Sequence, residues 1–208
     1  MEETKLSLSP EEHAIVADPE IILTKNGVLQ KIRGALDALY GWQLEFLKEK
    51  AAWFPPSLLA NSGKVSKGEN YNGLPYVVLD YPRNFRQGHI FAVRSMFWWG
   101  RQVSTTLHVS GEWQAYFLPR LVAGFELLKT GPYHLSYSGN EWEHDVQGES
   151  HLPFTEVTAA QWELLLKEKT FIKITAVAPI SQLERAPDLW RNAFRELMEL
   201  LEGKIPGT

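Results

Sequence analysis

The chain has 208 residues, 44% of them hydrophobic, no cysteine and a net charge of −4 at pH 7. The length suits one domain with a sizeable core, and the lack of cysteine excludes disulfides and thiolate chemistry and favours a cytoplasmic location. The acidic first residues argue against a signal peptide. No apolar run reaches the roughly 18 residues that cross a membrane, which argues against a membrane partner. The negative net charge argues against a nucleic-acid partner.

Two helix starts stand close together near the N-terminus. Ser9 and Asp18 each precede a proline that is followed by an acidic residue, which is the pattern of a capped helix start. From Leu29 onward apolar residues recur at helical spacing, so a long helix is expected before Pro55-Pro56. We expect residues 1–56 to form a tail and helical segment that packs on a main domain of residues 57–208, as one structural unit.

Strand signals follow the helical segment. Residues 57–75 are rich in turn-forming types, so at most a short strand is expected near residues 64–66. Residues 76–81 form an apolar run that reads as a buried strand stopped by Pro82. A short loop then leads to the next strands, and short connections favour antiparallel pairing.

The central feature is a β-hairpin over residues 89–110, because β-branched and aromatic residues flank Gly100 on both sides. If Gly100 and Arg101 form a two-residue turn, even positions of the first strand share a face with odd positions of the second. One face is then apolar and carries Arg94 as its single charge. The other face mixes aromatic and polar groups and is the predicted ligand site, with Ser95, Phe97, Trp99, Ser104, Thr106 and His108. A three-residue loop would mix the two sets.

The rest of the chain alternates helices and strands. Because Pro119 disfavours one continuous helix, we expect a short turn at 112–117 and a helix from about Leu118. The same rules predict a strand at 133–138, an acidic loop or hairpin arm at 139–153, a helix that begins after Thr158, a strand at 171–178, and a last helix at 187–202 stopped by Gly203. The predicted fold class is α+β, with an antiparallel sheet of about four to six strands packed by helices.

Asp80 and Arg94 lie in the middle of neighbouring predicted strands and can meet as an ion pair. A buried charge requires a partner, so the pair either fixes the strand register or places an Arg in a pocket for a carboxylate or phosphate. His108 lies near several hydroxyl groups, but the sequence shows no nucleophile elbow or oxyanion site. No catalytic residue is therefore assigned, and His108, Asp80 and Arg94 stay the candidates.

Two further groups of residues have alternative interpretations. The cluster Glu141, Glu143, His144, Asp145, Glu149 and His151 is interpreted as a solvated acidic loop rather than a loop that binds a calcium or zinc ion, because its spacing matches no metal motif. No metal or cofactor is predicted. Trp98 and Trp99 at the hairpin tip should be covered by another element, a ligand or a second subunit, and the simplest assembly is a homodimer.

The main functional hypothesis is a non-enzymatic module that binds a small ligand or a protein partner through the aromatic and hydroxyl face of the hairpin. The alternative is an enzyme of the hydrolase type with His108, Asp80 and Arg94 in one pocket. The two differ in geometry, because catalysis requires His108 within hydrogen-bond reach of an acid or a hydroxyl group in a cleft.

Overall fold

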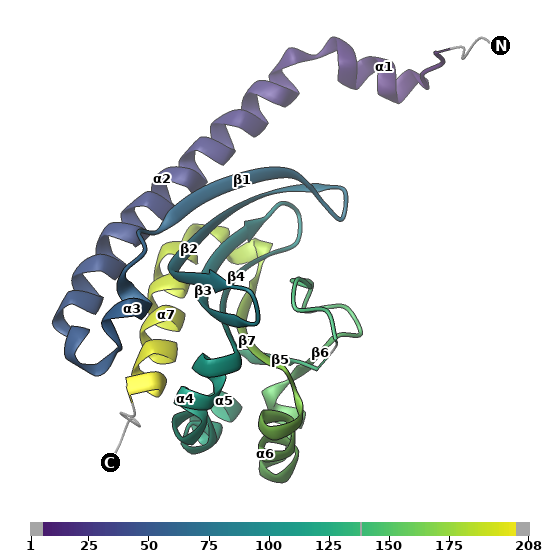
Figure 1. The fold of residues 1–208 in the computed structure, drawn as a ribbon. Helices are drawn as coiled ribbons and strands as arrows, with labels where there is room; N and C mark the ends of the chain where they lie inside the picture. The colour runs from purple at the N-terminus through teal and green to yellow at the C-terminus, as the bar shows by residue number, and fades with distance from the viewer. Residues whose placement is uncertain (1–5, 138, 203–208) are drawn as a thin grey trace.

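The structure is a computed structural model that describes residues 6–137 and 139–202 (Figure 1). It is an α+β fold, which confirms the predicted class, with a seven-stranded antiparallel sheet rather than four to six strands. The strand order is β1-β2-β3-β4-β7-β5-β6. The strands are β1 Lys64–Tyr71, β2 Leu74–Arg86, β3 His89–Trp98, β4 Gln102–Ser110, β5 Tyr133–Ser136, β6 His151–Pro153 and β7 Phe171–Pro179.

Helices cover one face of this sheet (Figure 1). They are α1 Pro10–Ala17, α2 Pro19–Glu49, α3 Pro56–Leu59, α4 Gly111–Ala123, α5 Phe125–Thr130, α6 Ala159–Glu168 and α7 Ala186–Glu202, with short 3₁₀ turns at Ala51–Trp53, Phe154–Glu156 and Ile180–Arg185. The apolar sides of α2, α4, α6 and α7 join the odd-numbered residues of β3 and β4 in one hydrophobic core. Burial of this apolar surface is the main stabilising contribution to the fold.

The N-terminal helices begin where the sequence predicts. Ser9 and Glu12 form a reciprocal capping box at the start of α1, and the Asp18 carboxylate accepts the Glu20 N–H at the start of α2. The buried stripe of α2 runs from Leu29 to Leu47, as the helical spacing indicates. The stripe of α2 contributes to the same core as the sheet. The division into residues 1–56 and 57–208 stays a prediction.

The register of the central hairpin corrects the predicted one. The Cα partners are Trp98 and Gln102, so three residues, Trp99 to Arg101, form the loop instead of two. The Arg101 N–H donates to the Trp98 carbonyl, and Gly100 between them has φ 68°, a conformation that glycine adopts without strain. With the extra loop residue, even positions of β3 share a face with even positions of β4, so the predicted partition of the two faces is wrong.

Two strands extend further than predicted. β1 spans eight residues and pairs with β2 through a hairpin whose turn is Asn72-Gly73, both residues at positive φ. Most of β1 was not predicted, because its residues are polar and half-exposed and strand prediction relies on an apolar pattern. β2 does not stop at Pro82, because the register shifts between Asp80 and Arg83 and this bulge removes the need for a proline N–H.

Pro119 does not interrupt its helix, which is a second correction. α4 is continuous from Gly111 to Ala123 with Pro119 inside it. An internal proline costs about 3 kcal/mol, and burial of Trp113, Phe117 and Leu121 on the core side of the helix offsets this cost. The predicted contributions of Ser138 to β5 and of Gly203 to the last helix end fall outside the described residues.

No helix within the described residues has both the length and the apolar character needed to cross a membrane.

Candidate functional site

The sheet face that the helices leave open carries polar groups. The hairpin register places the even residues of β3 and β4 on this face. Their cross-strand partners on β2 and β7, and the residues of β5 and β6 in register with those of β7, lie on it too. The polar and charged residues gathered there include Asp80, Arg94, Gln102, Ser104, Thr106, His108, Ser110, His134, Ser136, His151, Lys173 and Thr175. We call this set the polar face.

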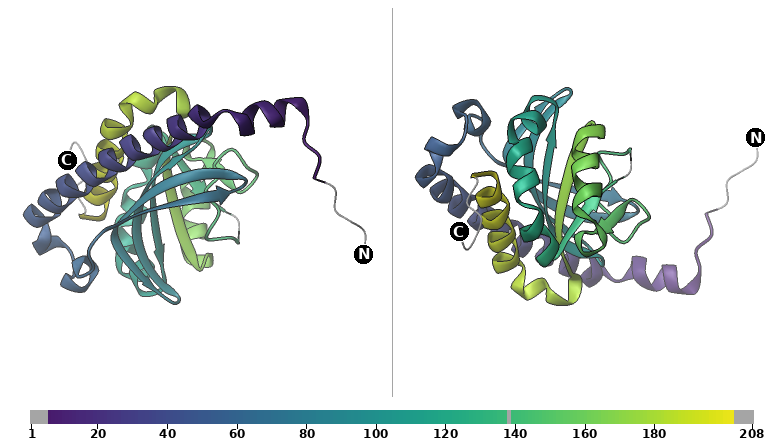
Figure 2. Two further views of the ribbon diagram at one scale, coloured as in Figure 1. Left: turned by 90° about the horizontal axis from the view of Figure 1, so that it is seen from above. Right: turned by 90° about the horizontal axis from the view of Figure 1, so that it is seen from below.

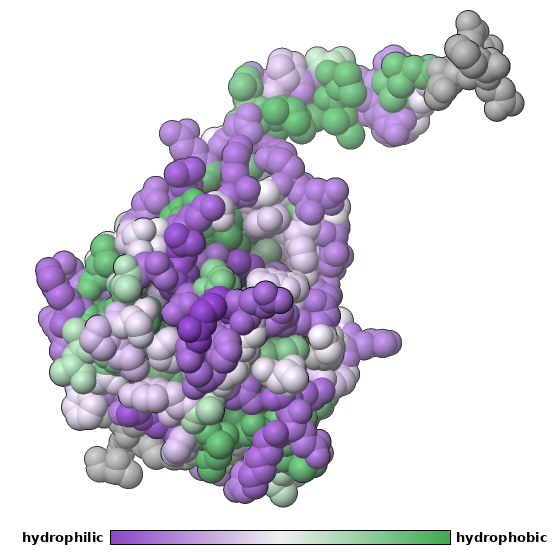
Figure 3. Space-filling model, in the orientation of Figure 1, coloured by the Kyte–Doolittle hydropathy of each residue, from purple (hydrophilic) through white to green (hydrophobic). Residues whose placement is uncertain are grey.

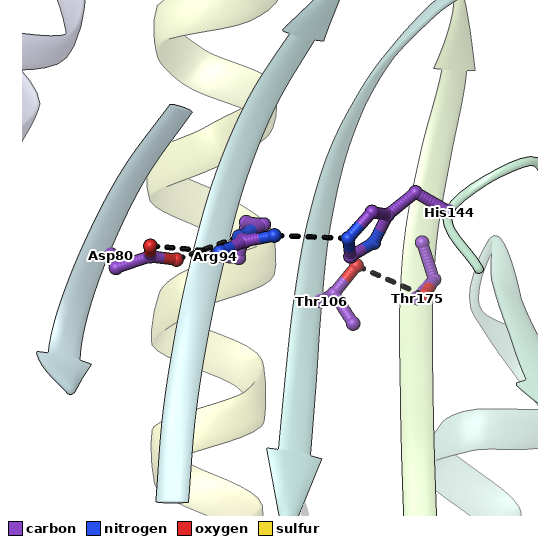
Figure 4. Close-up of polar contacts among 5 residues, drawn as sticks. All are labelled: Asp80, Arg94, Thr106, His144 and Thr175. Carbon is purple, nitrogen blue, oxygen red and sulfur yellow. Dashed lines mark hydrogen bonds and ion pairs between the residues drawn. The ribbon is translucent and has the colours of Figure 1, made fainter. Parts of the chain in front are cut away.

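Asp80 and Arg94 form the ion pair that the sequence predicts. The guanidinium donates from Nε to Asp80 Oδ1 at 2.7 Å and from Nη2 to Oδ2 at 2.9 Å, as Figure 4 shows. The two residues are Cα partners across β2 and β3, so the pair fixes this register. A bidentate pair satisfies both charges in a place where water is scarce.

A loop from Gly139 to Ser150 covers the polar face. The Glu143 carboxylate holds its turn by accepting from the Tyr71 hydroxyl and from the backbone N–H groups of His144 and Asp145. Burial raises the pKa of Glu143, but these donors outweigh that effect and lower it overall. Gln102 on β4 also donates to the His144 carbonyl at 3.1 Å. The loop, which we call the cover loop, is therefore tied to β1 and β4.

His144 brings a ring from the cover loop to the polar face. Its Nε2 lies 2.9 Å from Arg94 Nη1 (Figure 4). Because a guanidinium only donates, Nε2 accepts, and the ring is neutral with its proton on Nδ1. Burial, with Lys173 and Arg94 nearby, lowers the pKa of His144 well below its ordinary value, in agreement with a neutral ring.

Lys173 is the buried cation that sequence reasoning missed. Its side chain is 1% exposed, and its ammonium donates to the Glu143 carbonyl. No carboxylate oxygen of the described residues lies within 4.0 Å of its Nζ. Burial and the charge of Arg94 lower the pKa of Lys173 to about 8, against a partial opposing effect of Glu143 and Glu141. At pH 7 the group is therefore a protonated amine without an adjacent counter-ion.

His108 lies beside Lys173 as its Cα partner across β4 and β7. The ring packs edge-on against Trp142 and Phe171 with centroid distances of 6.0 and 5.8 Å. Burial, with Lys173 and Arg94, lowers the pKa of His108 to about 3, so the ring is neutral. Its Nε2 has no hydrogen-bond partner, and the Glu141 carboxylate lies 3.5 Å away.

Two hollows adjoin this cluster. A small cavity of about 10 Å³, roughly the space of one water molecule, lies among Asp80, Arg94, His108, His144 and Lys173. An open groove of about 870 Å³ lies between α4, α6 and the cover loop. Glu141 and Phe171 line the groove and also contact His108. The side chains of Glu141 and Phe171 therefore lie between the groove and His108.

Comparison with known proteins identifies no relative. No family model, curated protein or solved structure gives a significant match to this chain. The function is therefore argued from the site alone.

The predicted ligand set divides between the two faces. Ser104, Thr106 and His108 lie on the polar face, whereas Ser95 and Phe97 point into the core under the helices. The three-residue loop is the reason, because it changes the parity of the pairing. The predicted candidates Asp80, Arg94 and His108 do border one cavity.

The tryptophans of the hairpin tip also have separate environments. Trp98 is completely buried on the polar side, where it packs against Tyr71 and its indole N–H donates to the Tyr71 carbonyl. Trp99 is half-buried in the loop and packs against Phe97. Trp98 is thus covered by its own chain, and Trp99 is covered in part.

The cluster from Glu141 to His151 forms the cover loop and the start of β6. Among the described residues, no group of three or more His, Asp or Glu side chains has metal-binding geometry. Glu143 and His144 instead contact Tyr71 and Arg94. The signal that could have pointed to this arrangement is Lys173, a lysine in the middle of an apolar strand.

Proposed function

We propose that this protein binds a small anionic molecule, a carboxylate or a phosphate, at the polar face beneath the cover loop. The observation that carries the proposal is the buried Lys173 ammonium, which has no carboxylate of the described residues within 4.0 Å. An unpaired buried cation is costly, and an anionic ligand would compensate its charge. The proposal keeps the ligand-binding class predicted from the sequence and assigns it to the face that contains Ser104, Thr106 and His108.

The Glu141 carboxylate indicates the ligand chemistry. It is one-third exposed, faces His108 Nε2 at 3.5 Å and raises the pKa of Lys173 from a distance. A free carboxylate or phosphate in the place of the Glu141 side chain could approach both His108 and Lys173, because a free anion is not attached to the cover loop. Arg94 is held by Asp80 and has a remaining N–H directed at His144, so it would orient the site rather than supply its main charge.

The open groove provides the route to this position. It is larger than a small ligand requires, and its wall includes Glu141. Lys167 and Lys169 also line the groove and attract anions toward it. Displacement of the Glu141 side chain would connect the groove with Lys173 without unfolding the cover loop.

The test is a thermal-shift and calorimetric titration with inorganic phosphate, acetate and succinate. We expect at least one of these anions to stabilise the protein, Lys173→Met to abolish the effect, and Glu141→Gln to strengthen it by removing the competing carboxylate. Lys48→Met and Glu163→Gln are controls, because both residues are exposed and neither lines the groove or the cavity. Absence of binding for all three anions, or equal binding by Lys173→Met, would contradict the proposal.

The hydrolase alternative receives less support from the geometry. Both oxygens of Asp80 are engaged by Arg94, and the Thr106 hydroxyl is paired with that of Thr175 at 3.0 Å. No hydroxyl group of the described residues hydrogen-bonds to His108 Nε2. A nucleophile and its general base are therefore not paired. The cytoplasmic location, based on the absence of cysteine, belongs to the proposal as well.

A further inference from the structure

The N-terminal helices form an arm that projects from the body of the protein. α1 and the first turns of α2 extend beyond the sheet in all three ribbon views (Figures 1 and 2). Every residue from Ser9 to Thr24 is exposed. An eight-residue helix such as α1, which has no buried residue, is marginally stable in water by itself. The arm therefore lacks the packing that normally stabilises a helix.

The arm also presents aliphatic side chains to solvent. Five of them are between 43% and 74% exposed, and they form much of the hydrophobic surface along the arm in Figure 3: Ile15, Val16, Ile21, Ile22 and Leu23. Ile22 lies seven residues before Leu29 and Ile21 eleven before Ile32, so both continue the buried stripe of α2. The face of α2 that packs on the sheet thus extends outward without a covering element.

Charges along the arm change sign at Lys25. From Leu6 to Thr24 there are four acidic residues and no Lys or Arg, whereas Lys25, Lys31 and Arg33 follow without an acidic residue up to position 33. Two such helices in antiparallel contact, with a two-fold axis near Lys25, set the acidic half of each against the basic half of the other. The same charges repel when the helices pair in parallel.

A groove for the arm lies next to the basic half. It has a volume of about 300 Å³ and runs between α2 and β1, with Leu29 and Val77 at its apolar base. Arg33 and Lys67 line it with side chains 58% and 63% exposed, and among the described residues each has only a distant carboxylate of its own chain, Asp37 at 3.8 Å and Glu69 at 3.9 Å. An apolar base with a basic rim matches the aliphatic and acidic surface of the arm.

We infer that this chain forms a symmetric dimer in which the arm of each copy docks in the α2–β1 groove of the other. The contact is isologous, so each charge pair and each aliphatic contact occurs twice. A membrane surface is disfavoured as the occupant, because an acidic arm is repelled by anionic headgroups. The arm dimer differs from a dimer through the tryptophans of the hairpin tip, where Trp98 is completely buried within its own chain and Trp99 is half-buried.

The test is the oligomeric state of the full chain, measured by sedimentation velocity and light scattering over a range of concentrations. We expect a monomer–dimer equilibrium that Ile22→Glu weakens by about tenfold or more, because the new charge would be desolvated at the contact. Leu164→Glu is the matched control, since Leu164 is 52% exposed on α6, and it should leave the equilibrium unchanged.

A charge exchange identifies the pairing. Glu20→Lys and Arg33→Glu should each weaken the dimer, and the double variant should recover it, because the opposite charges then face each other again. A monomer at every concentration would overturn the inference. So would a dimer that is insensitive to Ile22→Glu, or one that the double variant weakens as the sum of its two single changes.

Discussion

Replacement of Lys173 by methionine should make the protein more stable at neutral pH while removing its proposed function. The pKa of Lys173 is lowered from 10.5 to about 8, which corresponds to a cost of ~3 kcal/mol for the charged form in the folded state. Methionine has similar length and no charge, but the Glu143 carbonyl then loses its donor, at a cost of ~1 kcal/mol. We expect a net gain of about 2 kcal/mol in the free energy of unfolding at pH 7.

The stability difference between Lys173→Met and the wild type should decrease as pH rises. Below pH 8 the amine is protonated in both states and the full penalty applies. Between about 8 and 10.5 the folded state has lost the proton and the unfolded state still holds it, so the wild type becomes more stable as pH rises. The difference between the two proteins should therefore shrink by up to ~1.4 kcal/mol per pH unit.

Urea unfolding at pH 7, 8, 9 and 10 measures both quantities for the wild type and for Lys173→Met. Lys48→Met is the control, because the Lys48 side chain is 75% exposed and should show neither effect. A Lys173→Met protein that is less stable than the wild type at pH 7, or a stability difference that is constant from pH 7 to 10, would refute the assignment of an uncompensated buried cation.

Three other measurements test the remaining parts of the site and hairpin. Burial lowers the pKa values of His108, His144 and His151, so the unfolded state takes up more protons than the folded state below pH 6.5. Unfolding experiments should therefore show the free energy of unfolding falling from pH 6.5 toward pH 4, by up to ~1.4 kcal/mol per pH unit for each ring. A flat profile would contradict buried neutral rings. Asp80→Leu should cost about 3 kcal/mol in urea unfolding by leaving Arg94 unpaired, and Asp80→Leu with Arg94→Met should recover most of it; additive losses would argue against a coupled pair. Gly100→Ala should cost about 1 kcal/mol because of its positive φ, and a neutral effect would contradict the loop conformation.

Local signals in the sequence were sufficient for much of the fold. The capping residues Ser9, Asp18 and Thr158 placed three helix starts correctly, because a cap depends on residues within one turn. The Asp80–Arg94 pair was also accessible, since a charge in the middle of an apolar strand requires a partner. The helix caps depend on neighbouring residues, and the ion pair follows from the cost of burying an unpaired charge.

The site depends on the length of the hairpin loop and on contacts between residues far apart in the sequence, and neither can be read from sequence periodicity. One additional residue in the loop after Trp98 exchanges the faces of β4, so Ser95 and Phe97 became core residues. The cover loop is positioned by Glu143 and Tyr71, which are 72 residues apart. Such a long-range contact between a loop and an edge strand has no local pattern, and the partners of Lys173 could not be found without it.

The two edges of the sheet limit how copies of this chain can associate. β1 at one edge carries Lys64, Lys67 and Glu69, and charged residues on an edge strand oppose the addition of another strand. β6 at the other edge is three residues long, too short to template extended pairing. Both edges are thus protected against strand-to-strand aggregation, so association of copies is directed to the helical arm rather than to the sheet.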